Sequence, residues 1–289
     1  MPGPLRLRAP TSLEYFATLV ADEASLPLLE AAAAIGQHAN PALDPQSVLA
    51  AVDELAARLK CRLPPDAAPL QRLRLLNRYF FHELGFAGNV NDYYDARNSD
   101  LSEVLKTRRG IPITLALLYI ELAAHAGLQA RGVSFPGHFL VKLHMPLGEV
   151  VIDPFSGRSL SRDELEERLA PFRRRRGSAS EDDPPLGLYL QAASPREMLV
   201  RLLRNLEDIH RSAEDWPRLR EVLDRLVVLL PDAWSLRRER GLVQAALGSF
   251  EPAVADLEVY LRHCPDAADA AALRARIAEL RRPPRGLVH

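Results

Sequence analysis

The sequence predicts an α+β domain followed by an all-α tail of helical repeats. Two observations predict it: a segment of alternating apolar and polar residues follows a run of helices, and the last third of the chain has helical periodicity throughout. The 289 residues suffice for two domains. We expect one domain over 1–175, helical over 1–85 with its sheet over 86–175, then a linker over 176–190 and repeats over 191–289.

The composition is that of an ordinary globular protein, with 47% hydrophobic and 26% charged residues. A formal charge of −1 gives no overall attraction to nucleic acid or anionic lipid. Cys61 and Cys264 lie far apart and suggest no disulfide framework, which favours a reduced compartment. No apolar run approaches the ~20 residues that span a bilayer, and no export signal is visible. We therefore expect a soluble cytoplasmic protein without membrane contact.

Helical periodicity dominates the region before residue 85. Thr11 and Ser12 are typical N-caps, Asp44 precedes a proline that opens a second helix, and a third helix is predicted over 66–84. Gly85 is expected to end that helix. We see no chemistry here and interpret the region as scaffold.

The loop that follows, GFAGNVNDYYDARNSD, is rich in glycine, asparagine and aspartate but too aromatic for a linker. It is either a structured connection or a loop beside a site. Asn98 and Ser99 are expected to hydrogen-bond to local backbone.

The clearest element is a helix over 112–126, with Pro112 in its first turn and Gly127 at its end. It is apolar nearly all round, which predicts burial. Thr114 in the first turn is one polar exception, and Glu121 and His125 form a pair four residues apart.

Strands are predicted next, over 131–135, 138–145 and 149–153. The second alternates cleanly, and Pro146-Leu147-Gly148 makes a hairpin turn. Folding back around that turn brings Asp153 within a few residues of the position opposite His138.

After the strands, Ser161 and Glu164 form a capping box that starts a helix through Ala170. The charged, proline-containing stretch 173–187 then marks a domain boundary. Its four arginines, Arg173–Arg176, could touch phosphate, but acidic residues follow closely and a solvated hinge is favoured, so we expect no nucleic-acid partner.

The tail has the period of tetratricopeptide repeats. Pro231 and Pro265 are 34 residues apart, the length of that repeat. Small and apolar residues fall where the repeat requires them, namely Gly241, Ala253 and Leu257. A last helix over 267–282, capped by Asp266, suits an end cap. Such repeats indicate a protein partner.

A buried helix, a strand with histidine and a strand ending in aspartate follow the chain order of papain-like and transglutaminase folds. There a cysteine at the helix start attacks, the histidine takes its proton and the aspartate orients the histidine. His138 and Asp153 fit the last two roles. The first role is vacant, because no cysteine lies between residues 62 and 263.

The motifs RRGIP, FPGHFLV and IDPF resemble those of the bacterial SirB-type transglutaminase-like family, which carries C-terminal tetratricopeptide repeats. The resemblance covers about residues 70–175 and implies a transglutaminase/papain-like fold, a cytoplasmic setting and no assigned activity. True transglutaminases would have cysteine near Pro112 or Ile113, so acyl transfer does not carry over. His138 and Asp153 match the other two triad positions.

Two functions stay open. The first is a non-catalytic binding or scaffold protein that holds a peptide in a cleft near Asn98, Ser99 and Pro112 and uses its repeats for a second contact. The second is a hydrolase or amide-processing enzyme in which His138–Asp153 activates water or Thr114, although an alcohol is a weak nucleophile.

We expect neither cofactor nor metal. His138 and His144 share a strand face but lie roughly 20 Å apart along an extended strand. The sequence has no zinc or phosphate-loop motif.

Overall fold

The computed structural model describes residues 8–175 and 184–282. The chain divides into two compact units. One comprises residues 22–202, and the other joins residues 1–21 to residues 203–289. The predicted linker 176–190 lies mostly in residues 176–183, outside the described residues, so the predicted domain boundaries stay a prediction.

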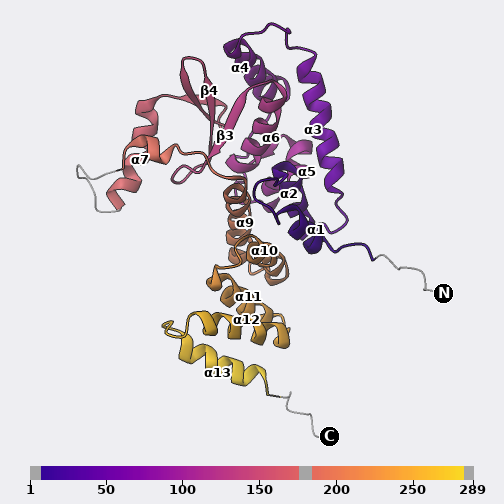
Figure 1. The fold of residues 1–289 in the computed structure, drawn as a ribbon, viewed down its shortest axis with the longest axis vertical. Coiled ribbons are helices and arrows are strands. Elements are labelled where there is room, and N and C mark those ends of the chain that lie inside the picture. Colours follow the sequence, from indigo (N-terminus) through magenta and orange to yellow (C-terminus); the bar gives the residue numbers. More distant parts are fainter. Residues whose placement is uncertain (1–7, 176–183, 283–289) are drawn as a thin grey trace, which may run out of the picture. The chain divides into compact units, whose positions relative to one another are not determined.

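The unit over 22–202 contains a helical part, one buried helix and a small sheet (Figure 1). Its helices are α2 (Leu28–Ile35), α3 (Pro45–Lys60), α4 (Pro69–Asn77), α5 (Leu101–Thr107), α6 (Pro112–His125), α7 (Arg162–Arg175), α8 (Leu186–Tyr189) and the start of α9 (Pro195–Ser212). Shorter turns are η1 (Gly36–His38), the π-helical η2 (Arg78–Glu83) and η3 (Ala96–Ser99), and two short strands pair in parallel, β1 (Ala87–Gly88) and β2 (Arg109–Gly110).

The helix starts and stops follow local chemistry. Asp44 caps α3 by accepting a hydrogen bond from the backbone N–H of Gln46 at 3.0 Å, as its position before Pro45 predicted. The predicted helix 66–84 is α4 continued by η2, and Gly85 ends it at φ +73°, where a side chain would be strained. The alanine-rich α2 was not predicted; its buried residues include Ala31 and Ile35.

The main sheet has four antiparallel strands in the order β3-β4-β5-β6. They are β3 (Gln129–Val133), β4 (Leu140–Met145), β5 (Gly148–Asp153) and β6 (Arg158–Leu160). The predicted second strand started two residues too early, because His138 still lies in the turn before Leu140. The short edge strand β6 was not predicted.

Helix α6 is the centre of this unit and packs on β3 and β4 (Figure 1). Its buried side chains lie on all sides, as the apolar sequence predicted. Near its end, His125 Nε2 lies 3.4 Å from the carboxylate oxygen Oε1 of Glu121.

The start of α7 is capped as predicted. The backbone N–H of Ser161 donates to Glu164 at 2.8 Å, and the N–H of Glu164 donates to Ser161 Oγ at 3.2 Å. The helix continues past Ala170 and contains Pro171.

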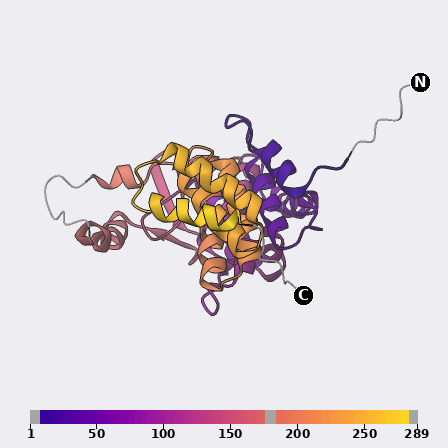
Figure 2. The ribbon, with the colours of Figure 1, turned by 90° about the horizontal axis from the view of Figure 1, so that it is seen from below.

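The second unit is a stack of antiparallel helices, of which α12 and α13 lie side by side in Figure 2. Its helices are α1 (Ser12–Leu19), the end of α9, α10 (Trp216–Leu229), α11 (Trp234–Ala246), α12 (Phe250–His263) and α13 (Ala270–Leu280). The N-terminal α1 packs on α10, so this unit takes in both ends of the described chain. The last helix starts three residues later than predicted, with Asp269 at its N-cap position instead of Asp266.

The repeat signature has a packing reason. A Cβ atom on Gly241 would lie 2.9 Å from Leu257 Cγ and 3.1 Å from the carbonyl oxygen of Ala253. Only a glycine therefore lets α11 and α12 approach this closely.

Candidate functional site

The β4–β5 hairpin brings His138 and Asp153 together. Its register pairs Val141 with Ile152, which sets Asp153 opposite Leu140, two residues from His138. His138 Nε2 lies 2.8 Å from Asp153 Oδ1. Because a carboxylate can only accept, Nε2 carries the proton of this hydrogen bond, and in the neutral imidazole Nδ1 then keeps the lone pair. The histidine is thus oriented as a base or as a hydrogen-bond acceptor.

The side chain of Asp153 is only 5% exposed, and both of its carboxylate oxygens accept hydrogen bonds. Its Oδ1 also accepts from the backbone N–H of Phe155 at 3.0 Å, and its Oδ2 accepts from Arg168 Nη1 and Nη2, both at 3.2 Å. Burial raises the pKa of Asp153, but the hydrogen bond and charge of His138, with bonds from Phe155 and Ser156, outweigh it and hold the pKa below its usual range. Asp153 is therefore an anion that fixes the imidazole.

Arg168 was not predicted as a site residue. It comes from α7 and donates to Oδ2 of Asp153, whereas His138 bonds to Oδ1. The sequence held one usable signal: a buried carboxylate next to a histidine needs a further partner, and α7 brings the arginine into place.

The start of α6, where a nucleophile would belong, is closed. Ile113 is 1% exposed and Thr114 is 0% exposed, and Pro112 is buried as well. The single proton of the Thr114 hydroxyl has two carbonyl acceptors in reach, Asn98 O at 2.8 Å and Ile111 O at 3.0 Å, and the oxygen accepts from the N–H of Ile111 at 3.2 Å. Thr114 is therefore part of the helix cap. No bond joins it to His138 among the described residues.

Asn98 and Ser99 are buried beneath the loop. The Asn98 amide donates to the carbonyls of Asp92 at 2.6 Å and Tyr93 at 3.2 Å, and its Oδ1 accepts from Asn89 at 3.0 Å. It therefore shapes the loop 89–98. Ser99 Oγ has no hydrogen-bond partner within the described part of the chain.

Aromatic side chains flank the histidine. The Phe155 ring lies 6.3 Å from the His138 ring and 5.9 Å from the Tyr93 ring, which in turn lies 5.3 Å from Tyr94. Tyr93 is 41% and Tyr94 76% exposed. Through Phe155, the loop that carries Tyr93 and Tyr94 therefore lies near His138. We call Tyr93, Tyr94 and Phe155 the aromatic surface.

Gly88 holds this loop against the site. Its N–H donates to Phe155 O at 2.9 Å, and a Cβ atom at residue 88 would lie 2.3 Å from the Phe155 ring. The aromatic surface therefore depends on a glycine whose role the sequence did not indicate.

Neither cysteine is hydrogen-bonded to His138, Asp153 or Arg168 among the described residues. Cys61 follows α3 and is exposed, and Cys264 belongs to the repeat unit. Among the described residues no three histidine, cysteine, aspartate or glutamate side chains gather as metal ligands would. Nor does any helix within the described ranges have the length and apolar character to cross a membrane.

Comparison with known proteins gives two family matches. The transglutaminase-like superfamily matches residues 46–204, and a tetratricopeptide repeat family matches residues 206–278. A UPF0162 protein of Xylella fastidiosa is 36% identical over 260 residues, 90% of this chain and 92% of that protein. A UPF0162 protein of Pseudomonas aeruginosa is 32% identical over 262 residues, 91% and 94% of the two chains.

A more distant relative covers less. F-box only protein 21 of Mus musculus is 28% identical over 170 residues, which is 56% of this chain and 26% of that protein. No solved structure matches the chain.

Proposed function

Since this chain belongs to the UPF0162 family of bacterial transglutaminase-like proteins with tetratricopeptide repeats, we propose that it is a non-catalytic protein-binding protein. It holds a peptide segment beside His138 and contacts proteins through its repeat unit. It works in the cytoplasm and without a cofactor.

The closed start of α6 carries this proposal. An acyl-transfer site needs a nucleophile with access to substrate and with a proton acceptor in reach. Here the hydroxyl of Thr114 is fully buried and bonded to backbone carbonyls, and Pro112 and Ile113 stand where the attacking sulfur belongs.

The aromatic surface supports peptide binding. Tyrosine rings give a large contact area for little loss of side-chain entropy, and their hydroxyls hydrogen-bond to backbone groups. The His138 ring lies 6.3 Å from the Phe155 ring, and in the neutral imidazole Nδ1 can accept a peptide N–H. Arg168 and Asp153 then serve to fix the imidazole, and the burial of Asn98 and Ser99 makes them supports of the loop.

A photo-cross-linking experiment tests the proposal. With benzoylphenylalanine in place of Tyr94, the protein should cross-link to protein partners in cells, and His138→Ala should reduce the yield. The same group in place of Leu188, which is 53% exposed in the same unit, is the matched control. Equal yields at positions 94 and 188 would refute a binding surface beside His138.

One observation favours the alternative of a hydrolase that uses water. The ionised Asp153 and the Nε2 proton leave His138 Nδ1 available as a general base. Purified protein would be assayed against amide and ester libraries, with His138→Ala as the test variant and His144→Ala, on the same hairpin and exposed, as the control. Turnover that only His138→Ala abolishes would establish the hydrolase.

A further inference from the structure

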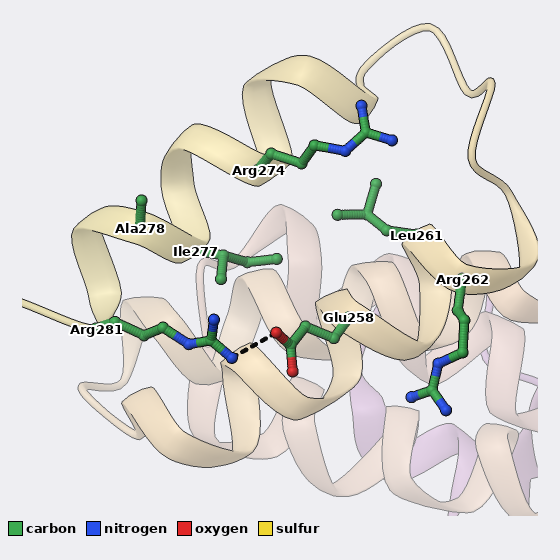
Figure 3. A pocket seen from close by; sticks show the side chains of 7 residues that line it. All are labelled: Glu258, Leu261, Arg262, Arg274, Ile277, Ala278 and Arg281. Carbon is green, nitrogen blue, oxygen red and sulfur yellow. Dashed lines mark hydrogen bonds and ion pairs between the residues drawn. The ribbon is translucent and has the colours of Figure 1, made fainter.

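A groove with a cationic rim lies in the repeat unit between α12 and α13. It has a volume of about 750 Å³ and is lined from both helices (Figure 3). Its lining residues are Glu258, Leu261, Arg262, Arg274, Ile277 and Arg281, with Ala278 beside them.

Two of the three arginines have no acidic partner. Arg262 makes neither an ion pair nor a side-chain hydrogen bond among the described residues, and Arg274 only donates to the carbonyl of Pro265 at 3.2 Å. Arg281 pairs with Glu258, but these side chains are 59% and 42% exposed. An exposed pair of this kind contributes little stability, so an incoming carboxylate can replace it.

The floor of the groove is apolar. Ile277 is 6% exposed and Leu261 is half-buried, and in Figure 3 both lie between the guanidinium groups of Arg274 and Arg281. A ligand that suits this surface needs negative charge at its edges and an apolar side chain at its centre.

The chemistry favours a peptide over nucleic acid. Single-stranded nucleic acid binds where aromatic rings stack on its bases, and none of the lining residues is aromatic. Glu258 repels a continuous row of phosphates, whereas an acidic peptide can place its carboxylates selectively on Arg262 and Arg274.

We propose that the groove between α12 and α13 binds an acidic peptide segment of a partner protein. Aspartate or glutamate side chains of the segment bind Arg262 and Arg274, and an apolar side chain packs on Leu261 and Ile277. This inference rests on the proposed function, in that the repeat unit contacts proteins, and it names the surface and the charge of the partner.

Two charge reversals on one helix give a matched test. Arg274→Glu changes the groove, whereas Arg276→Glu changes another exposed arginine of α13, one that pairs with Glu279 and does not line the groove. The probe is a fluorescent peptide of alternating glutamate and leucine with serine spacers, measured by anisotropy with the full chain. Placing like charges together should weaken binding roughly tenfold or more in Arg274→Glu and leave Arg276→Glu near wild type.

Arg262→Glu serves as the second variant, because it lies on the other helix, and thermal unfolding of each variant checks the fold. Equal binding by wild type, Arg262→Glu and Arg274→Glu would overturn the proposal. So would equal binding of a peptide with lysine in place of glutamate, or binding of polyuridine RNA or phosphatidylserine vesicles in place of the acidic peptide.

The two proposals fail separately. If cross-linking at residue 94 is lost but peptide binding still depends on Arg274, only the proposed binding surface beside His138 is refuted. If cross-linking at residue 94 persists but the acidic peptide does not bind, only the proposed peptide site in the groove is refuted.

Discussion

Replacing Asp153 by asparagine keeps the shape of the side chain and removes its charge. In the wild type, this carboxylate accepts hydrogen bonds from His138, Arg168 and the backbone of Phe155. Asparagine has only one acceptor oxygen, so its NH₂ group must face either His138 or Arg168. One cationic or N–H donor then loses its partner.

The expected cost follows from that loss. A hydrogen bond to a charged group contributes about 1.5–3 kcal/mol, and a buried donor left without a partner costs a similar amount. Arg168 is 37% exposed and can turn to water, which reduces its share. We therefore expect Asp153→Asn to lower the free energy of unfolding of the unit over 22–202 by about 2 kcal/mol.

The loss depends on pH in a defined direction. The pKa of Asp153 is lower in the folded protein than in the unfolded chain, so its stabilisation is fully present above the unfolded pKa of about 3.9. It is lost as pH falls from there toward the folded pKa. The difference between wild type and Asp153→Asn should therefore shrink as the solution becomes more acidic than about pH 4.

Hydrogen exchange of peptides from β4 and β5 is the suitable assay. Tryptophan fluorescence would not report on this unit, since Trp216 and Trp234 both lie in the repeat unit. Glu167→Gln, an exposed change on α7 next to Arg168, is the control and should match wild type. Unchanged protection in Asp153→Asn at neutral pH, or a difference that grows in acid, would refute the account of this carboxylate.

Three further substitutions test other parts of the structure. Gly88→Ala should displace the Phe155 ring and cost about 1–3 kcal/mol, seen as changed chemical shifts of Phe155 and lower stability; an unshifted ring contradicts it. Thr114→Val should cost about 1–2 kcal/mol in urea unfolding because the cap loses its hydroxyl, while Thr114→Ser should stay near wild type; equal stability of all three proteins would show that the cap is dispensable. Gly241→Ala should force Leu257 aside and lower the thermal midpoint measured by tryptophan fluorescence, and an unaltered midpoint would mean that α11 and α12 need no glycine.

Much of the fold could be predicted from local pattern. The capping box at Ser161, the proline that opens α6 and the spacing of Pro231 and Pro265 each have a short-range physical cause. The edge strand of the main sheet was less predictable. The strand β6 has only three residues, too few for a clear alternation, and its pairing with β5 decides its conformation.

The candidate site could be predicted in part. His138 and Asp153 lie on one hairpin, so strand geometry alone brings them near each other. The roles of three further residues, Arg168, Phe155 and Gly88, could not be predicted in this way. They depend on how α7 and the loop pack against that hairpin, and this tertiary packing produces no periodic pattern in the sequence.

The absence of a working nucleophile is the central claim, and mass spectrometry after exposure to an activated ester tests it most directly. Wild type and His138→Ala should show the same background acylation, spread over surface amines. A single acyl adduct that forms in wild type and disappears in His138→Ala, on Thr114 or on any other side chain, would contradict the claim.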